Sequence, residues 1–465
     1  MNASHALEAV VRGRVRPLSA RVARAALCAA VALSALPAFG WSNHALSTRP
    51  ALEGMPEVAR LAPVKVETLE AFLAAEGPHL EKVLDEQERW AREHVPTYPA
   101  RPDALRFVAA GAADAAELRR RFVAALRISP DARLSLFLQR HPGEVADERP
   151  PMAAREVTTL PRDYAVEAAK FVALREGESV SPLAVIATAS DEPDYGLDIG
   201  LWEDNGTAQG RAYGFGKQPF GNPALDFGTQ APFHMGFFHE ARIIYAAAGF
   251  LKRTYPEYRI HLWKTLALHA LRTGHDYWGW RFAGWAMHYL QDLTQPYHAR
   301  VLPGLGTVRM LWINALQIAG WPGARNRAVT LVSNRHLAFE NFHRFAMLAG
   351  YRERGRSAAL FDALGGAGAG ADPKYDDDSP RAVVTRRAAD AADALDRTIA
   401  ASLPARYVSD PSFEFGASEE GIDLFASLSR DDPAGRDALV RALTPRLADY
   451  GAQTRAFVRS LLAGR

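Results

Sequence analysis

His288-Tyr-Leu-Gln-Asp292-Leu-Thr-Gln-Pro-Tyr-His298 holds three potential metal ligands within one short stretch. On an α-helix, residues four apart lie on the same face, so His288 and Asp292 can bind one cation. Pro296 ends this helix or begins the next element, so a turn sets the direction of His298 and lets it serve a second ion. Imidazole and carboxylate ligands without a thiolate suit zinc, and open positions on such ions carry catalytic water.

A second pair with the same spacing follows in His336-Leu-Ala-Phe-Glu340. A single helical histidine is more often a packed or solvated residue than a ligand. Because the chain has 14 histidines, one His-x-x-x-acid pair by chance is unsurprising. Two such pairs, together with His298, are not easily explained by chance and indicate a metal site.

The composition favours an all-α fold around these pairs. The 465 residues are 48% hydrophobic and 23% charged, and long β-branched runs are scarce, which favours helix over sheet. Apolar periodicity predicts helices in much of the region 65–145 and in five later segments. These segments are 235–271, 277–293, 333–348, 380–402 and 436–463.

Two stretches rich in turn-forming residues interrupt the helical pattern. Residues 191–232 are rich in Gly, Pro, Asp and Asn but also contain aromatic residues, so we expect a long, ordered and functional loop. Residues 364–379 are rich in Gly and Asp, and we expect a flexible linker there. No Gly-rich phosphate loop is present.

The first forty residues have the pattern of a secretory signal. Five arginines precede a short apolar run, 25–36, and small residues follow it, the order found in signal peptides. The alternatives are an ordinary N-terminal helix and a membrane anchor, but the run is shorter than the roughly 20 residues that span a bilayer. We therefore expect an exported, periplasmic or secreted protein whose mature chain begins at Trp41.

Signal cleavage would change the chemistry of the chain. The only cysteine, Cys28, lies in the signal, so the mature chain would have no disulfide; lipid attachment at Cys28 is a weaker alternative. Removing five arginines and one glutamate would change the net charge from +2 to −2. A mildly acidic chain is a poor partner for a nucleic-acid backbone.

The two ligand segments resemble those of a known family, the bacterial zinc-dependent phospholipases C, which include the clostridial alpha-toxin. The resemblance rests on two groups of residues: Met287-His288-Tyr289, Asp292 and Pro296-Tyr297-His298, and His336-Leu-Ala-Phe-Glu340-Asn-Phe342. It implies an all-helical fold that holds three zinc ions. In this family the mature chain starts with a tryptophan whose amine and carbonyl bind zinc, which is the position of Trp41.

The resemblance also implies the remaining ligands. His44 resembles the N-terminal histidine ligand, Asp194 the aspartate ligand and His234 the histidine that follows it; Asp198 and His239 are the alternatives to the last two. Three zinc sites are implied. The first consists of Asp194, His234, His288 and Asp292, and the second of Trp41, His44 and Asp292, which bridges the two sites. The third consists of His298, His336 and Glu340. Asp194 would also act as general base, and Tyr195 resembles an aromatic residue of the family's choline pocket.

The expected organisation is a signal peptide at 1–40 and an all-helical catalytic domain at 41–465. Within it, residues 45–190 form a helical insertion and residues 380–465 form C-terminal helices, of which 447–462 corresponds to the family's last core helix. The resemblance covers Trp41–His44 and residues 190–345.

The resemblance implies a phospholipase C that cleaves phospholipids at a membrane surface. Single-strand-specific nucleases and nucleotidases share the scaffold and are the alternative, as is a metal-stabilised binding protein without turnover. Glu340 favours the phospholipases because the nucleases typically have Asp there, whereas the short spacing from Trp41 to His44 favours the nucleases.

One segment has no counterpart in the resemblance. Residues 310–321 are apolar and have a tryptophan near each end, Trp312 and Trp321. We expect an interfacial helix beside the active site; periodicity alone is equally consistent with a helix buried in the core.

Overall fold

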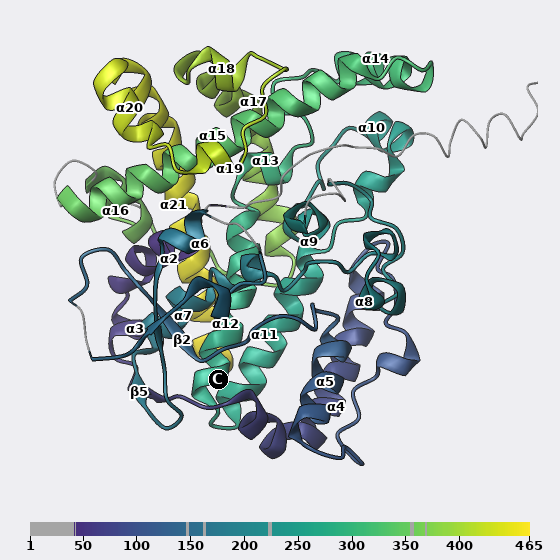
Figure 1. The fold of residues 1–465 in the computed structure, drawn as a ribbon, viewed down its shortest axis with the longest axis vertical. Coiled ribbons are helices and arrows are strands. Elements are labelled where there is room, and N and C mark those ends of the chain that lie inside the picture. Colours follow the sequence, from purple (N-terminus) through teal and green to yellow (C-terminus); the bar gives the residue numbers. More distant parts are fainter. Residues whose placement is uncertain are drawn as a thin grey trace, which may run out of the picture.

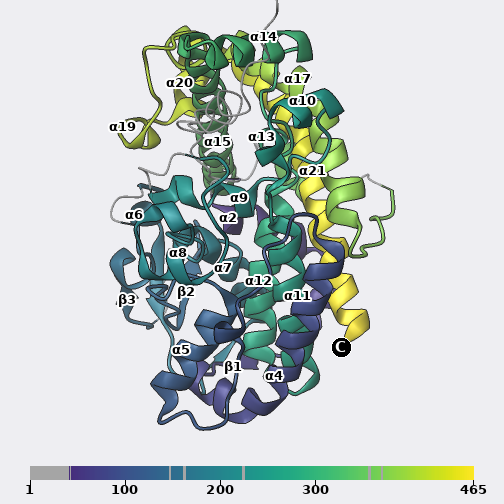
Figure 2. The same cartoon turned by 90° about the vertical axis from the view of Figure 1, so that its right-hand side faces the viewer.

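The computed structural model describes residues 41, 43–145, 148–160, 164–221, 226–353, 358–367 and 370–465. The expected signal peptide, residues 1–40, lies outside this part. Helices dominate the described residues (Figures 1 and 2), so the predicted all-α class is confirmed. Among the described helices, none is both long enough and apolar enough to cross a membrane.

The centre of the molecule is a pair of neighbouring helices, α11 (Pro256–Arg272) and α12 (Asp276–Asp292), seen side by side in Figures 1 and 2. Residues 277–292 of α12 are all buried. A helix that is buried all round must be packed on every side. At Gly284 a Cβ would lie 2.5 Å from the Cβ of Ala189 in α7 (Pro182–Ala189), so only glycine allows α7 to pack this closely.

Further helices surround this pair. The C-terminal helix α21 (Pro433–Gly464) and the short N-terminal helix α2 (His44–Glu53) contact each other and reach α12 or α7. The long helix α15 (Gly323–Glu353) and the helices α13 (Pro296–Ala299) and α17 (Thr385–Ser402) form the upper part in Figure 1.

The hydrophobic core is divided into two large clusters. One surrounds α11 and α12 and includes Met287, Tyr289 and Leu290. The other includes Trp41, Tyr297 and many residues of α15. The predicted ligand segments lie where these clusters meet, since residues 287–290 belong to the first cluster and Tyr297 to the second.

The region 45–190, expected as a helical insertion, contains helices together with two small sheets. The helices α4 (Leu69–His94) and α5 (Ala115–Leu126) are present. The region also contributes two small antiparallel sheets. One pairs β1 (Val64–Lys65) with β5 (Ser179–Val180). In the other, β4 (Lys170–Ala173) lies between β2 (Phe137–Arg140) and β3 (Pro151–Met152). Strands of two to four residues are too short for a period-two pattern to stand out.

The segment 364–379 is not the free linker expected from its composition. Its first residues end α16 (Ala358–Gly365). The Asp372 carboxylate forms ion pairs with Arg455 and Arg459 of α21, and Tyr375 packs edge-on against Phe457. The described residues of this segment are therefore held against the last helix.

The glycine- and proline-rich segment 191–232 is ordered in its described part, as predicted. It forms the short helices η3 (Glu192–Tyr195), η4 (Glu203–Asn205) and α8 (Ala208–Ala212), and its first ten residues are almost wholly buried. This segment brings Asp194 and Asp198 to the centre of the molecule.

Candidate metal centre

Eight of the predicted ligands meet at the boundary between the two core clusters, and all eight are buried. They are His44 at the start of α2, Asp194 in η3, His234 at the end of α9 (Ala231–His234), His288 and Asp292 in the last turns of α12, His298 in α13, and His336 and Glu340 in α15. Three groups of these side chains could each hold a metal ion: His44, His288 and Asp292; Asp194, His234 and His288; and His298, His336 and Glu340.

The group of Asp194, His234 and His288 is arranged around the ring of His234. The Nδ1 atom of His234 lies 2.8 Å from Asp292 Oδ2, 3.1 Å from His288 Nε2 and 3.7 Å from Asp194 Oδ1. His288 Nε2 lies 3.4 Å from Asp292 Oδ2 and 3.5 Å from Asp194 Oδ1. Ligand atoms at the corners of a zinc tetrahedron are about 3.3 Å apart, given metal–ligand distances of about 2.0–2.1 Å. These four side chains therefore have the spacing of a tetrahedral site.

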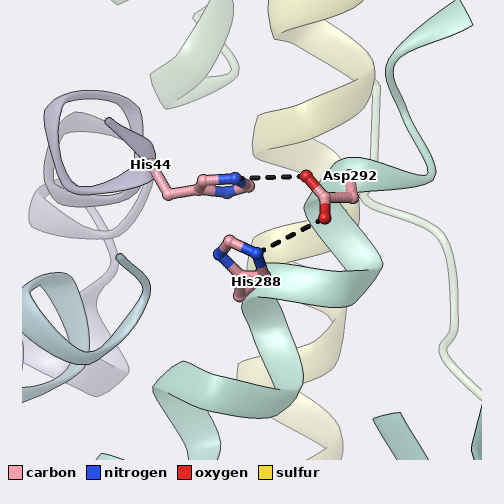
Figure 3. A group of neighbouring side chains, drawn as sticks. All are labelled: His44, His288 and Asp292. Carbon is pink, nitrogen blue, oxygen red and sulfur yellow. Dashed lines mark ion pairs between the residues drawn. The ribbon is translucent and has the colours of Figure 1, made fainter. Parts of the chain in front are cut away.

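Asp292 connects this group to a second one. Its Oδ1 lies 3.2 Å from His44 Nε2, while its Oδ2 lies 3.4 Å from His288 Nε2 (Figure 3). The same Oδ2 lies 2.8 Å from His234 Nδ1. The His44 and His288 rings lie against each other with centroids 4.1 Å apart. The two carboxylate oxygens thus point to two neighbouring groups, which is the arrangement of a bridging ligand.

The third group joins α13 and α15. His336 Nε2 lies 2.5 Å from Glu340 Oε1, one helical turn away, and the His298 ring meets the His336 ring edge-on. Tyr297 stacks on the other side of His336 with an interplanar angle of 13°. The stack and the helix together fix the direction of the imidazole.

Hydrogen bonds behind the ligands fix which nitrogen of each ring faces the centre. His288 Nδ1 contacts the Ser190 carbonyl at 2.7 Å, and His298 Nδ1 contacts the His234 carbonyl at 3.0 Å. A carbonyl can only accept, so these Nδ1 atoms carry the hydrogen and each Nε2 offers a lone pair. Such outer partners orient metal-binding histidines and raise their basicity.

His44 and His234 have side-chain partners instead. His44 Nδ1 lies 2.9 Å from Gln291 Oε1, whose amide nitrogen donates to Thr48 and Thr454. His234 Nε2 lies 3.5 Å from Asp198, on the side away from the other ligands.

Carboxylates dominate the electrostatics of the centre. Burial lowers the pKa of a histidine, but hydrogen bonds with Asp198 and Asp292 outweigh it at His234 and raise its pKa to about 10. Burial raises the pKa of Glu340 well above its usual range and lowers that of His336 well below. His336 is therefore neutral and keeps its lone pair for a cation.

Several buried atoms of the centre have no hydrogen-bond partner among the described residues. An unpaired buried polar atom costs about 1–3 kcal/mol, and a cation between these atoms would satisfy several of them. The donor set, imidazole and carboxylate only, is one that zinc accepts. The unpaired atoms are His44 Nε2, Asp194 Oδ1, His234 Nε2, Asp292 Oδ1, His336 Nε2 and Glu340 Oε2.

The two alternative ligands lie elsewhere. Asp198 stands behind His234 and accepts hydrogen bonds at 2.6 Å from both Arg259 and Tyr289, so it is engaged as a supporting carboxylate. His239 Nε2 contacts the Arg381 carbonyl and the Thr385 hydroxyl, outside the three groups. Asp194 and His234, the first choices, belong to the groups.

Trp41 lies next to the centre through its side chain. The indole is fully buried and donates from Nε1 to Thr294 Oγ1 at 2.9 Å, two residues beyond Asp292. It packs edge-on against His343 and Tyr450. In the full-length chain the main-chain nitrogen of Trp41 is an amide, so its predicted role as a ligand depends on cleavage before this residue.

A small pocket of about 50 Å³ opens beside the candidate metal centre and is lined by Asp194. Tyr195 lines it, as expected of a substrate-binding residue, and its hydroxyl donates to Gln139 at 2.7 Å. Val166 and Phe415 make part of the wall apolar. The pocket also contains polar residues that the sequence had not indicated: Asn43, Asp191, Asn341, Arg344 and Glu420.

Two of these overlooked residues had a signal in the sequence. Arg344 follows His336 and Glu340 at intervals of four, which places it on the same face of α15. Asp191 begins the run that contains Asp194; burial raises its pKa to about 6, and it accepts a hydrogen bond from the Ala45 amide beside His44. Glu420 reaches the pocket from another part of the chain and had no such signal.

Comparisons with family models, with curated proteins and with solved structures found no match for this chain. The functional interpretation therefore rests on the geometry of the site and on the resemblance of its motifs.

Proposed function

We propose that this protein is an exported zinc-dependent phosphodiesterase, a phospholipase C that cleaves the glycerol–phosphate bond of phospholipids. The observation that carries the proposal is the set of three adjoining ligand groups, two of which share His288, at the base of an open pocket. A purely structural site is usually closed by protein ligands, whereas a catalytic site borders on space for substrate.

Three zinc ions held by these groups would supply an activated water and positive charge for the attacking and leaving oxygens of an in-line displacement. The chain itself supplies the rest. Asp292 holds two ligand groups at a fixed spacing, and Asp194 stands at the pocket wall, where it accepts the proton of the attacking water.

The pocket lining supports a substrate with both an anionic and a cationic part. Arg344 is 4% exposed and lines the pocket, a place from which a guanidinium binds a phosphate oxygen. Tyr195 and Glu420 line the same pocket, and an aromatic face together with a carboxylate suits an amine headgroup. We propose phosphatidylcholine as the substrate, with choline in contact with Tyr195.

The first test is metal content and turnover of the protein that begins at Trp41. We expect bound zinc and hydrolysis of a chromogenic phosphocholine ester and of phosphatidylcholine vesicles. His336→Ala should lower turnover more than about 100-fold, the loss that outer partners of metal ligands alone can reach. His269→Ala is a matched control, because His269 pairs with Glu76 at 2.7 Å outside the metal centre.

The controls decide between the components of the proposal. Absence of zinc from the purified chain would overturn it entirely. Bound zinc without turnover of any ester would leave the alternative of a metal-stabilised binding protein. Equal rates on phosphatidylcholine and phosphatidylethanolamine would contradict choline selectivity. An uncleaved or N-terminally tagged chain should bind less zinc, since acylation removes the amine of Trp41 as a ligand.

The alternative activity, that of a single-strand nuclease or nucleotidase, has one structural feature in its favour. A second groove shares Asn43 and Arg344 with the pocket and is lined by Arg140, Lys170 and Arg352. A basic groove suits a polyanion. Single-stranded DNA and 3′-nucleotides should therefore be assayed beside the lipids; faster hydrolysis of these substrates would replace the phospholipase assignment.

A further inference from the structure

The helix α14 (Thr307–Ile318) carries an exposed apolar surface at one end of the molecule (Figures 1 and 2). Trp312 is 63% exposed and Trp321, just after the helix, is 68% exposed. Five of the eight exposed large hydrophobic side chains of the described residues lie on α14 or beside it. We call them the α14 patch: Ile243, on the contacting helix α10 (Arg242–Ala247), and Val308, Trp312, Ile318 and Trp321.

The helix α14 is apolar on its exposed face as well as on its inner face, where Met310 and Ile313 are buried. Val308, Trp312 and Ala315 follow at intervals of four and three and are all exposed, so they form one stripe. Asn314 and Gln317 line a small, mostly apolar pocket of about 80 Å³ beneath the helix together with Ile313, and Gln317 Oε1 is buried without a hydrogen-bond partner among the described residues. A surface helix in water normally has polar residues on its outer face.

The exposed charges around the α14 patch are positive, and the neighbouring acidic residue Glu240 is buried and pairs with Arg300. Residues 241–253 and 299–335, which meet around the pocket beneath α14, contain eight Lys and Arg and no Asp or Glu. Four of these cations are exposed and form no ion pair among the described residues: Arg242, Lys252, Arg309 and Arg327. Apolar side chains with tryptophans at the water boundary, surrounded by basic residues, match an anionic bilayer surface.

We propose that the α14 patch and its four surrounding cations are a docking surface for anionic lipid bilayers. The charge pattern selects this occupant, because a second copy of the chain would bring like charges together around the patch. The expected position of the helix beside the active site is wrong. About 20 Å of α15 separates Gly323 from His336, at 1.5 Å per residue, and α14 does not line the pocket at the metal centre. Docking is thus distinct from substrate binding.

Docking is tested by vesicle sedimentation of the chain that begins at Trp41, with no turnover required. The vesicles contain phosphatidylglycerol and phosphatidylcholine at 3:7, or phosphatidylcholine alone. We expect binding to the anionic vesicles to be salt-sensitive and at least about 10-fold tighter than to neutral ones. Trp312→Ala combined with Trp321→Ala should reduce binding to both vesicles about 10-fold or more.

A charge-reversal variant tests the basic residues. Arg309→Glu combined with Arg327→Glu should weaken binding to anionic vesicles at least about 25-fold, since each basic residue at such a surface contributes about five-fold. Arg89→Glu combined with Arg120→Glu is the matched control, because both residues are exposed and lie on α4 and α5 at the opposite end. Val145→Ser, at a side chain that is 91% exposed outside the α14 patch, is the apolar control.

Three results would overturn docking: no binding of the unaltered protein to anionic vesicles, equal loss in the control variants, or a dimer in sedimentation velocity that the tryptophan variant converts to monomer. Turnover separates this inference from the proposed function. If docking is correct, the tryptophan variant loses activity on anionic vesicles but retains it on a soluble phosphocholine ester. If the phospholipase assignment fails, vesicle binding remains with no lipid product.

Discussion

At the scale of single residues, the metal centre depends on groups that do not face the ion positions themselves. Gln291 lies between His288 and Asp292 in the sequence but faces another direction, toward His44 and two threonines. A neutral amide oxygen can accept only from an N–H, so Gln291 holds His44 in the form with hydrogen on Nδ1 and a lone pair on Nε2. Asp198 supports His234 in a comparable way, with its own charge balanced by Arg259.

Gln291→Met should therefore weaken metal binding while keeping the volume of the side chain. We expect about 10- to 100-fold lower zinc affinity, the range found for outer partners of metal-binding histidines. Zinc retained after dialysis against a competing chelator measures it. Gln87→Met, at a buried glutamine of α4, is the matched control. Unchanged affinity in Gln291→Met would show that His44 needs no orienting partner or is no ligand.

At the scale of elements, a contact between two helices can make the stability of the fold depend on pH, because it buries a titratable side chain. His261 of α11 stacks on Trp90 of α4 with ring centroids 3.5 Å apart and an interplanar angle of 3°. Burial lowers its pKa to about 4, although Asp377 opposes this. The α4–α11 contact therefore buries a neutral imidazole that becomes charged in acid.

The sign of the resulting pH dependence follows from the two states. In the unfolded chain His261 titrates near its ordinary pKa of about 6.5, so the unfolded state binds the proton first. Stability is complete above pH 6.5 and is lost as the pH falls toward 4, by about 2 kcal/mol between pH 7 and pH 5.

His261→Phe should remove this part of the acid sensitivity, because phenylalanine keeps the stacking and cannot titrate. Urea denaturation at pH 7 and pH 5 measures the difference. The variant should lose less stability between these values than the unaltered protein, by about 2 kcal/mol. An equal loss in both proteins would show that His261 is protonated in the folded state as readily as in the unfolded one.

At the scale of the whole molecule, the metal centre joins parts of the chain that are far apart. Its side chains come from positions between 44 and 340. Three carboxylates and five imidazoles, with Asp198 behind them, bury much unbalanced charge. Ions bound only in the folded state would stabilise it by mass action.

Removal of metal should consequently destabilise the whole protein. An ion at 100 times its dissociation constant contributes about 2.7 kcal/mol, so three such ions contribute about 8 kcal/mol. At an unfolding entropy of about 2.1 cal/mol/K per residue, we expect a chelator to lower the Tm by about 9 °C. Scanning calorimetry with chelator, and again after addition of zinc or of magnesium, measures this. Zinc should restore the Tm and magnesium should not. A Tm that does not respond to the chelator would contradict the presence of structural or catalytic ions.

The sequence alone determined the helical class and most of the candidate ligands. The reason is that residues four apart lie on the same face of a helix, as His288 does with Asp292 and His336 with Glu340. It also indicated an unusual apolar segment around Trp312. These features are local, so they are visible in the chain without its fold.

Tertiary structure decided what depends on contacts between distant segments. Only the fold shows that Asp194 rather than Asp198 faces the centre, because both lie in the same loop and its path sets their directions. It also pairs the short strands at 137–140 and 170–173 and brings Glu420 into the pocket. It places the α14 patch away from the metal centre, since the length of α15, rather than proximity in sequence, fixes that separation.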